Sequence, residues 1–279
     1  MPDTTVHYVV IGHLAKDLTP DGPRLGGTAA YAALTAQAIG YAPGLVTAFG
    51  DDLDLGPLAG FPCARTASSD STTFENIYGL DGRTQFLRAR ATPLNSNAIP
   101  AEWRRAPIIH LAPLAREVDP KMITEFAGTF VGVTPQGWLR RWDAEGRVRN
   151  EGWPEAMEIL PHASAAVLSL EDLHGDWSLA ERWAKAARVL VITEGAQGCT
   201  VFAKGEGARQ FTTRPETEVD PTGAGDIFAA AFFIHLYETE DPWAAAKFAN
   251  HVGAVAVTRI GLEGVPTPDE AALGRMKAK

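Results

Sequence analysis

The sequence predicts an α/β protein of three layers, α/β/α, with helices on both faces of a mostly parallel central sheet. Short, nearly continuous apolar runs rich in Val and Ile recur along the chain, and helical stretches lie between most of them. Strands of this kind, separated by helices, are typical of a parallel sheet that is buried on both faces. The 279 residues suffice for one large domain or two small ones, and no repeat or low-complexity tract divides them, so we predict a single domain over residues 1–279.

Each strand expected in the central sheet is a short apolar run. In chain order these runs are 7–12 (HYVVIG), 44–50 (GLVTAFG), 108–112 (IIHLA), 130–134 (FVGVT), 165–170 (AAVLSL) and 189–193 (VLVIT). The helices expected between and after them are amphipathic or rich in Ala, and they cover residues 28–39, 119–128, 154–160, 177–187, 224–238 and 242–259.

One segment interrupts this alternation. Residues 71–90 have strand-forming residues on both sides of Asp81-Gly82, a dipeptide suited to a type I′ hairpin turn. Such a hairpin stands either at an edge of the central sheet or outside it, as a lid over a cleft. We expect a small β lid, to which residues 17–25 add a strand, so that the lid strands span about 13–25 and 71–90.

The composition is that of an ordinary globular protein, with 46% hydrophobic and 21% charged residues. The formal net charge of −9 argues against nucleic acid or an anionic membrane as the main partner. The longest apolar stretches are too short to span a bilayer, and the first residues contain no targeting pattern. Two distant cysteines without metal-ligand spacing, Cys63 and Cys199, favour a cytoplasmic protein.

The stretch EVDPTGAGDIFAAAFF, residues 218–233, points to phosphate chemistry. Gly223, Ala224 and Gly225 precede an apolar helix, where glycines let backbone amides converge and the helix N-terminus adds partial positive charge. Asp226 beside that anion site could accept the proton of an attacking hydroxyl, as a carboxylate does in phosphoryl transfer. The motif alone fits equally well a second interpretation, in which Asp226 only caps the helix.

Other residues could bind a ligand near the first strand. Asp17 follows that strand, at the edge where ligands bind in open α/β sheets, and its carboxylate could accept hydrogen bonds from two vicinal hydroxyls. Gly26 and Gly27 precede a helix, where adjacent glycines permit close approach of a ligand to the backbone. The alternatives are a solvated loop acid and a plain loop-to-helix junction. The chain has neither a P-loop nor a dinucleotide-binding fingerprint, which argues against an NAD-dependent dehydrogenase.

The stretch DPTGAGDIFAAAFF closely resembles the C-terminal signature of the ribokinase-like (PfkB) carbohydrate kinases, D-T-x-G-A-G-D-x-F, with Pro221 where that family commonly has Thr. Further segments resemble family segments in the family's order: GHLAKDLTPDG, LGGTAAYAALTAQAIG, VTAFGDD, VITEGAQGCTVF and FANHVGAVAVTRIG. The resemblance covers essentially the whole chain. It implies the ribokinase-like fold, with its small β lid.

The resemblance also implies roles for the matching residues. Asp226 would be the catalytic base, and the amides of residues 223–225 would form the anion hole. Asp17, Gly26 and Gly27 would position the acceptor. The residues on the nucleotide side would be Thr193, Gly195, Gly198, Thr222 and Asn250.

Three segments depart from the family pattern. Tyr31 occupies the last position of G-G-x-x-x-N, where the family often has a sugar-binding asparagine, and this argues against ribose or fructose. SLEDL replaces the family's N-x-x-E, so its magnesium-linked role would pass to Asp172 or its neighbour Glu171, through water. TPQGWLRRW resembles the Q-G-x-x-R segment of an inositol-kinase-like branch, which makes Gln136 and Arg140 candidate substrate contacts, with a surface hairpin as the alternative.

The sequence therefore indicates an ATP-dependent kinase of a small polyol or sugar, with a myo-inositol-like acceptor favoured. ATP and Mg²⁺ would be its cofactors, and a requirement for a monovalent cation stays open. One alternative is a nucleoside kinase in which Tyr31 stacks on the base. Others are a phosphorylated sugar acceptor, which Asp17 would repel, and a non-catalytic relative, which would have no need of Asp226. We expect a monomer, or a homodimer formed through the lid.

Overall fold

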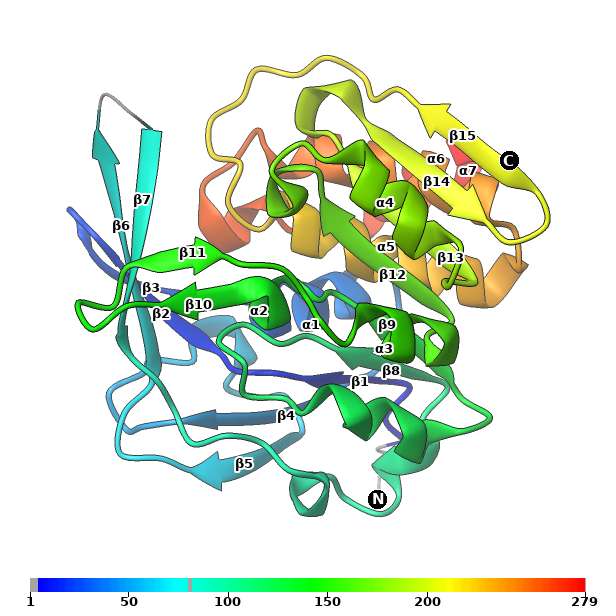
Figure 1. Cartoon of the computed structure of the whole chain (residues 1–279). Helices are drawn as coiled ribbons and strands as arrows, with labels where there is room; N and C mark the ends of the chain where they lie inside the picture. The colour runs from blue at the N-terminus through cyan, green and yellow to red at the C-terminus, as the bar shows by residue number, and fades with distance from the viewer. Residues whose placement is uncertain (1–4, 80–81, 279) are drawn as a thin grey trace.

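The central element is a nine-stranded sheet with the strand order β15-β14-β13-β12-β9-β8-β1-β4-β5 (Figure 1). The computed structural model describes residues 5–79 and 82–278. The strands of this sheet are β1 (Tyr8–Ile11), β4 (Pro43–Phe49), β5 (Cys63–Ala67), β8 (Ile108–Leu111), β9 (Phe130–Val133), β12 (Ala165–Ser169), β13 (Val189–Thr193), β14 (Cys199–Ala203) and β15 (Gly207–Phe211). All neighbours pair in parallel except the last two strands of the chain, β14 and β15, and every strand expected from an apolar run is present.

The strand order reverses at β1. From β1 the chain builds outward through β4 and β5, and it then returns to the other side of β1 and builds outward through β8, β9, β12 and β13. In open α/β sheets the carboxyl ends of the strands at such a reversal form a ligand-binding crevice. The segments that leave β1 and β9 at this edge carry Asp17 and Gln136.

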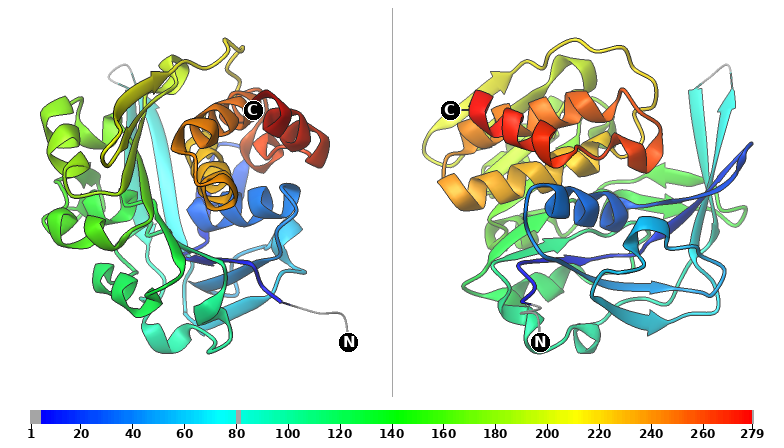
Figure 2. Two further views of the ribbon diagram at one scale, coloured as in Figure 1. Left: turned by 90° about the vertical axis from the view of Figure 1, so that its right-hand side faces the viewer. Right: turned by 180° about the vertical axis from the view of Figure 1, so that it is seen from behind.

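Helices cover both faces of the sheet, as the edge-on view in Figure 2 shows. One face carries α1 (Thr28–Ala38), α5 (Ala224–Thr239), α6 (Pro242–Ala256) and α7 (Pro268–Ala278). The other face carries α3 (Ala156–Ile159), α4 (Trp177–Ala184) and the 3₁₀ helix Pro120–Phe126. Helix α5 is buried on all sides from Ile227 to Leu236, because it packs between the sheet, α1 and α6.

The lid is a separate four-stranded sheet with the order β3-β2-β6-β7. Strands β6 (Thr72–Gly79) and β7 (Gly82–Ala89) form the hairpin expected at 71–90, and Figure 1 shows it projecting away from the central sheet. Asp81, the first residue of the predicted Asp81-Gly82 turn, lies outside the described residues. The other expected strand is in fact two, β2 (Ala15–Thr19) and β3 (Gly22–Gly26), because Gly22 has a φ of 116° and reverses the chain there.

A short hairpin docks on the lid from the core. It begins after the single-turn helix α2 (Gln136–Leu139) and consists of β10 (Arg140–Trp142) and β11 (Val148–Asn150). At its tip, the Leu87 amide of β7 donates to the carbonyl of Gly146 at 2.8 Å. The hairpin therefore joins the edge of the lid to the part of the core that carries α2.

Two expected helices are shorter or tighter than the pattern indicated. Residues 120–126 form a 3₁₀ helix in place of an α-helix over 119–128, and the Thr124 hydroxyl there donates to the carbonyl of Lys121, in competition with the backbone ladder. The α-helix expected at 154–160 is only α3, because Pro161 lacks the amide needed to continue it.

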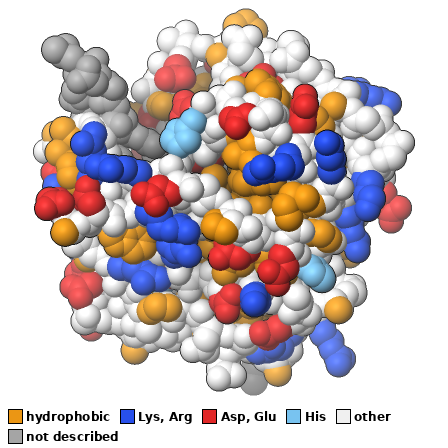
Figure 3. All heavy atoms as spheres, in the orientation of Figure 1, with side chains coloured by type: hydrophobic (Ala, Val, Ile, Leu, Met, Phe, Trp, Pro, Cys, Tyr) orange, Lys and Arg blue, Asp and Glu red, His pale blue; other side chains and the backbone are white. Residues whose placement is uncertain are grey.

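Figure 3 shows the face that carries α4 and the β10–β11 hairpin. Acidic and basic side chains are interspersed over it, with hydrophobic side chains gathered to the right of centre. No single sign of charge dominates this face. Among the described residues, no helix is both long and apolar enough to cross a membrane.

Candidate active site

The glycine-rich turn before α5 is shaped by a buried aromatic ring. Gly223 is the N-cap of α5 and has a φ of 79°, in the left-handed region that favours glycine. A Cβ atom on Gly223 would lie 2.2 Å from the ring of Tyr31, so no other residue fits this turn. Tyr31 is only 2% exposed. The expectation that Tyr31 could stack on a nucleoside base is therefore wrong, because its ring is buried beneath the turn.

The start of α5 presents unpaired backbone amides. The Ala224 amide donates to the carbonyl of Pro221 at 3.2 Å, so it is already engaged. Within the described part of the chain, the amides of Gly223 and Gly225 have no hydrogen-bond acceptor. These are donors that the first turn of a helix leaves free, and they sit at its positive end. Of the expected anion hole, Gly223 and Gly225 are thus better placed than Ala224 to bind an anion.

Asp226 lies where two helix N-termini meet. Its Oδ1 accepts a hydrogen bond from the hydroxyl of Thr28, the first residue of α1, at 2.7 Å. Burial raises the pKa of Asp226 to about 6; the carboxylates of Asp172 and Asp17 act in the same direction, whereas Thr28 and Arg140 lower it. A carboxylate with a pKa near neutrality, held by one hydrogen bond, has the properties of a general base. The sequence analysis missed Thr28, although its place directly after Gly26-Gly27 was a signal.

Asp17 belongs to the lid. It lies in β2, opposite Arg24 of β3, and not in a loop beyond the first strand. A Cβ atom on Gly26 would lie 2.1 Å from Oδ2 of Asp17, so the absence of a side chain at Gly26 makes room for this carboxylate. Asp17 raises the pKa values of both Tyr31 and Asp226, so its charge lies near the base.

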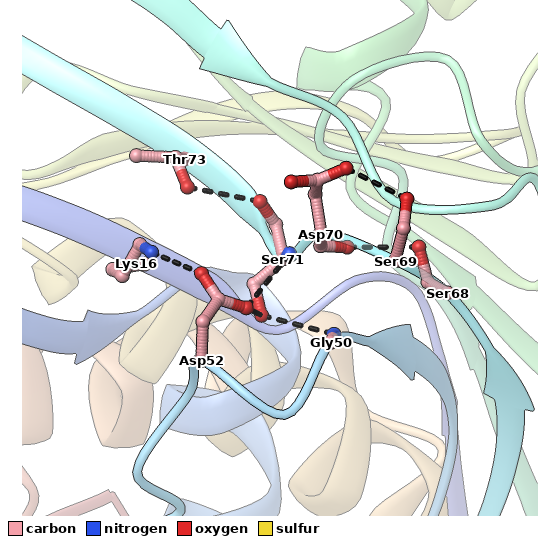
Figure 4. Close-up of polar contacts among 8 residues, drawn as sticks. All are labelled: Lys16, Gly50, Asp52, Ser68, Ser69, Asp70, Ser71 and Thr73. Atoms are coloured by element: carbon pink, nitrogen blue, oxygen red, sulfur yellow. Dashed lines mark hydrogen bonds and ion pairs between the residues drawn. The ribbon is translucent and has the colours of Figure 1, made fainter.

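A polar cluster ties the two halves of the lid to the core, as Figure 4 shows. Asp52, in the loop after β4, accepts hydrogen bonds from Lys16 of β2 and from the hydroxyl and the amide of Ser71, just before β6. The Ser71 hydroxyl in turn accepts from the Gly50 amide at 3.1 Å. Hydrogen bonds from Lys16 and Ser71 lower the pKa of Asp52 to about 2. We call Lys16, Asp52 and Ser71 the lid anchor; Lys16 directly precedes Asp17.

One cavity of about 510 Å³, the acceptor cavity, lies between the lid and the core. It is lined by Thr84, Gln85, Gln136, Arg140, Arg147, Val148, Arg149, Asn150, Ser169, Glu171, Asp172 and His174. Arg140 is buried, donates to the carbonyl of Leu114 at 3.0 Å and lies 5.2 Å from the ring centre of Phe74 in the lid. The two residues expected from the Q-G-x-x-R segment, Gln136 and Arg140, therefore share one cavity and are not an exposed hairpin.

A second cavity of about 920 Å³, the donor cavity, lies between the β13–β14 turn, the segment after β15, α5 and α6. Four of the five residues expected on the nucleotide side line it: Thr193, Gly195, Gly198 and Asn250. Thr222 is not among the lining residues; its amide donates to Asp220, whose other oxygen accepts from Gly261. Ala224 and Gly225 at the start of α5 also line this cavity.

Asn250 and Asp172 have structural partners. The Asn250 amide group donates to the carbonyl of Phe211 at 3.0 Å, which holds the end of β15 against α6. Asp172 accepts from the Ser169 amide at 3.1 Å and from the Asn150 side chain at 3.4 Å. Among residues 5–79 and 82–278, no group of three His, Cys, Asp or Glu side chains is placed to hold a metal ion. The expected role of Asp172 at a Mg²⁺ ion, through water, stays a prediction.

The two cavities share Ser169, Glu171 and His174, so they adjoin. Asp226 directly follows Gly225 of the donor cavity, and its pKa responds to Arg140 and Asp172 of the acceptor cavity. A base between an anion-binding turn and a polar cavity is the arrangement that transfer of a phosphoryl group to an alcohol requires.

Comparisons with known proteins agree with this geometry. Residues 148–269 match the pfkB family carbohydrate kinase model. The chain is 28% identical over 248 residues to a cytidine kinase of Thermococcus kodakarensis, covering 80% of this chain and 86% of that protein. It is 32% identical over 149 residues to an inositol 3-kinase of Oryza sativa subsp. japonica, covering 52% of this chain and 36% of that protein.

Among solved structures, a pyrophosphate-dependent myo-inositol-1 kinase converted into a myo-inositol-3 kinase superposes with a TM-score of 0.79 at 20% identity, covering 95% of this chain and 98% of that one. This likeness shows the ribokinase-like fold. The relatives matched in sequence are named as kinases with alcohol acceptors. Over residues 148–269, the chain is similar to the pfkB family of carbohydrate kinases.

Proposed function

We propose that this chain acts as one kinase unit that transfers the γ-phosphoryl group of ATP to a hydroxyl of a small neutral polyol, with a myo-inositol-like acceptor. The observation that carries the proposal is the position of Asp226, between the free amides at the start of α5 and the charged groups of the acceptor cavity. The acceptor hydroxyl attacks the γ-phosphorus, Asp226 takes its proton, and the bond to the bridging oxygen breaks to release ADP. The amides of Gly223 and Gly225 stabilise the charge on the phosphoryl oxygens.

The size and lining of the donor cavity favour ATP over pyrophosphate. Beyond the anion-binding turn, the cavity continues along Phe228, Ala254, Val257 and the β13–β14 turn. Its volume of about 920 Å³ leaves room for an adenosine group that pyrophosphate would not fill. Mg²⁺ would be bound by the phosphates and water, with Asp172 and Glu171 as acidic neighbours, and it would neutralise charge on the phosphates.

Hydrogen-bonding groups dominate the acceptor cavity, which favours a polyol. Side-chain amides of Gln85, Gln136 and Asn150 face it together with the Arg140 guanidinium. Among the described lining residues there is no Phe, Tyr or Trp, and His174 has the one aromatic ring, so a flat base has few stacking partners there. The Asp17 carboxylate is not among the lining residues, but its charge lies near Asp226, where we propose that it accepts hydrogen bonds from acceptor hydroxyls.

Cytidine is the second candidate acceptor, because the cytidine kinase match extends over most of both chains. Mass-spectrometric detection of the phosphorylated product, with myo-inositol, ribose, fructose and cytidine as acceptors and with either ATP or pyrophosphate as donor, tests both proposals. The highest kcat/KM is expected for myo-inositol with ATP. A preference for cytidine would replace the polyol, and turnover only with pyrophosphate would overturn the choice of donor.

A further inference from the structure

A third cavity, of about 440 Å³, lies beside α6 and α7 and is separate from the turn that carries Asp226. Figure 2 shows these helices side by side, on the opposite face of the sheet from α4. We call this the basic cavity, and its lining residues are Gln210, Phe211, Thr212, Thr213, Arg214, Lys247, Asn250, His251 and Lys277.

Every ionisable side chain that lines the basic cavity is a base, although the protein carries a formal net charge of −9. Arg214 is paired with Glu216 at 2.6 Å. Among the described residues, Lys247 and Lys277 form no ion pair. Lys247 and Lys277 are exposed and line one cavity, with Glu216 and Glu270 as the acidic groups that act on His251 there. An anion between the two ammonium groups would reduce the repulsion between them.

His251 lies in the wall of this cavity with its ring unsatisfied. The residue is 9% exposed, its ring packs against Gly274 of α7, and within the described chain it makes no hydrogen bond. Burial and the charges of Arg214 and Lys277 lower the pKa of His251, while Glu270 and Glu216 oppose this shift. His251 is therefore close enough to Arg214 and Lys277 to sense a change of charge in the cavity.

We propose that the basic cavity is a binding site for a phosphate dianion, either free phosphate or the phosphate group of a small monoester. Lys247 and Lys277 supply ammonium donors on two helices, and Thr212 adds a hydroxyl. Phosphate oxygens accept hydrogen bonds from lysine and hydroxyl donors. Among the described residues no carboxylate lines the cavity, and Glu216 is engaged by Arg214. The basic cavity shares Thr213, Arg214 and Asn250 with the donor cavity and so adjoins it, but the amides of Gly223 and Gly225 do not line it.

The test uses the full chain with its histidine rings isotope-labelled, and follows His251 by NMR during titration with potassium phosphate. Potassium chloride at matched ionic strength is the reference. A saturable shift of the His251 signals and a rise in its pKa are expected, because an added anion stabilises the protonated ring. A parallel titration with glycerol phosphate shows whether the free ion or the monoester binds more tightly.

The double variant Lys247→Gln, Lys277→Gln should bind phosphate about tenfold more weakly or worse, the loss of at least one charge-assisted hydrogen bond. The matched control is Lys185→Gln, Lys204→Gln, which removes the same charge from exposed positions elsewhere. Equal weakening in both double variants, or no saturable shift at His251, would overturn the proposal. The readout is binding alone, so failure of the kinase proposal leaves it intact.

Discussion

On the donor side of Asp226, the groups that face the cavity come largely from backbone turns; on the acceptor side, they are side chains from separate segments. The donor cavity uses the β13–β14 turn and the first residues of α5, each continuous in sequence. The acceptor cavity combines β7, α2, β11 and the segment after β12. A turn that depends on glycines keeps its shape only if those glycines are kept. A cavity assembled from separate side chains can change by single substitutions. The stretch that most closely resembles the family signature, DPTGAGDIFAAAFF, accordingly begins beside the donor cavity.

The largest effect is expected from Asp226→Asn, at the junction of the two sides. Turnover should fall by roughly 10²–10⁴-fold, the usual contribution of a general base, while ATP affinity stays nearly unchanged. Steady-state kinetics and ATP binding measure the two quantities. Burial raises the pKa of Asp226 to about 6, so at pH 8 the folded protein contains an ionised carboxylate that burial disfavours. Asparagine removes this charge, so the melting temperature of the variant at pH 8 should be no lower than that of the wild type. Normal turnover in a folded variant would leave Asp226 as a helix cap.

Gly225→Val should impair the use of ATP without unfolding the protein. A Cβ atom on Gly225 meets no other atom, so the branched side chain fits the fold but stands in the donor cavity. We expect kcat/KM for ATP to fall by roughly 100-fold, the scale of an ångström-sized misplacement, with little change in melting temperature. Gly223→Ala is the contrasting variant, which should lose stability because its Cβ meets Tyr31. Unchanged ATP kinetics in Gly225→Val would show that phosphate does not approach this turn.

The pH dependence of kcat/KM should report Asp226. A base must be ionised, so the rate should fall by about tenfold per pH unit below the pKa near 6 and level off above it. In the Asp226→Asn variant the residual rate should lack this step. A wild-type profile flat from pH 5 to 8 would contradict the assignment.

Asp17→Asn should weaken binding of the acceptor and leave binding of ATP unchanged. It keeps the shape and removes a charge-assisted hydrogen bond, so the KM for the acceptor should rise by about tenfold, with the KM for ATP unchanged. Asp21→Asn is a matched control on the exposed turn between β2 and β3. Equal loss for both substrates would indicate a general defect in folding.

The smallest effect is expected from Asp52→Asn in the lid anchor. The variant weakens the contacts with Lys16 and Ser71 that hold β2 and β6 to the core, and so allows Asp17 to shift. The acceptor KM should rise by roughly fivefold or less, within the range of a partly exposed ion pair, and ATP binding should not change. Asp51→Asn, which removes the exposed partner of Arg65, controls for charge. If ATP binding alone changes, the anchor does not act through the lid.

Much of this protein was determined by the sequence itself. Apolar runs separated by helical patterns predicted the parallel strands, because burial on both faces of a sheet requires continuous hydrophobicity. The turn at Gly223–Asp226 and the glycines at 195 and 198 were recognisable because backbone geometry there depends on local residues.

Only the tertiary structure decided the contacts between distant segments. Thr28 meets Asp226 across 198 positions, and the ring of Tyr31 fills the space beneath Gly223 because α1 packs against α5. The lid anchor, the docking of Gly146 on Leu87 and the convergence of three bases around His251 likewise join separate elements. Helical and strand periodicity shows which face of an element is buried, but not which partner covers it; that choice depends on how the whole core packs.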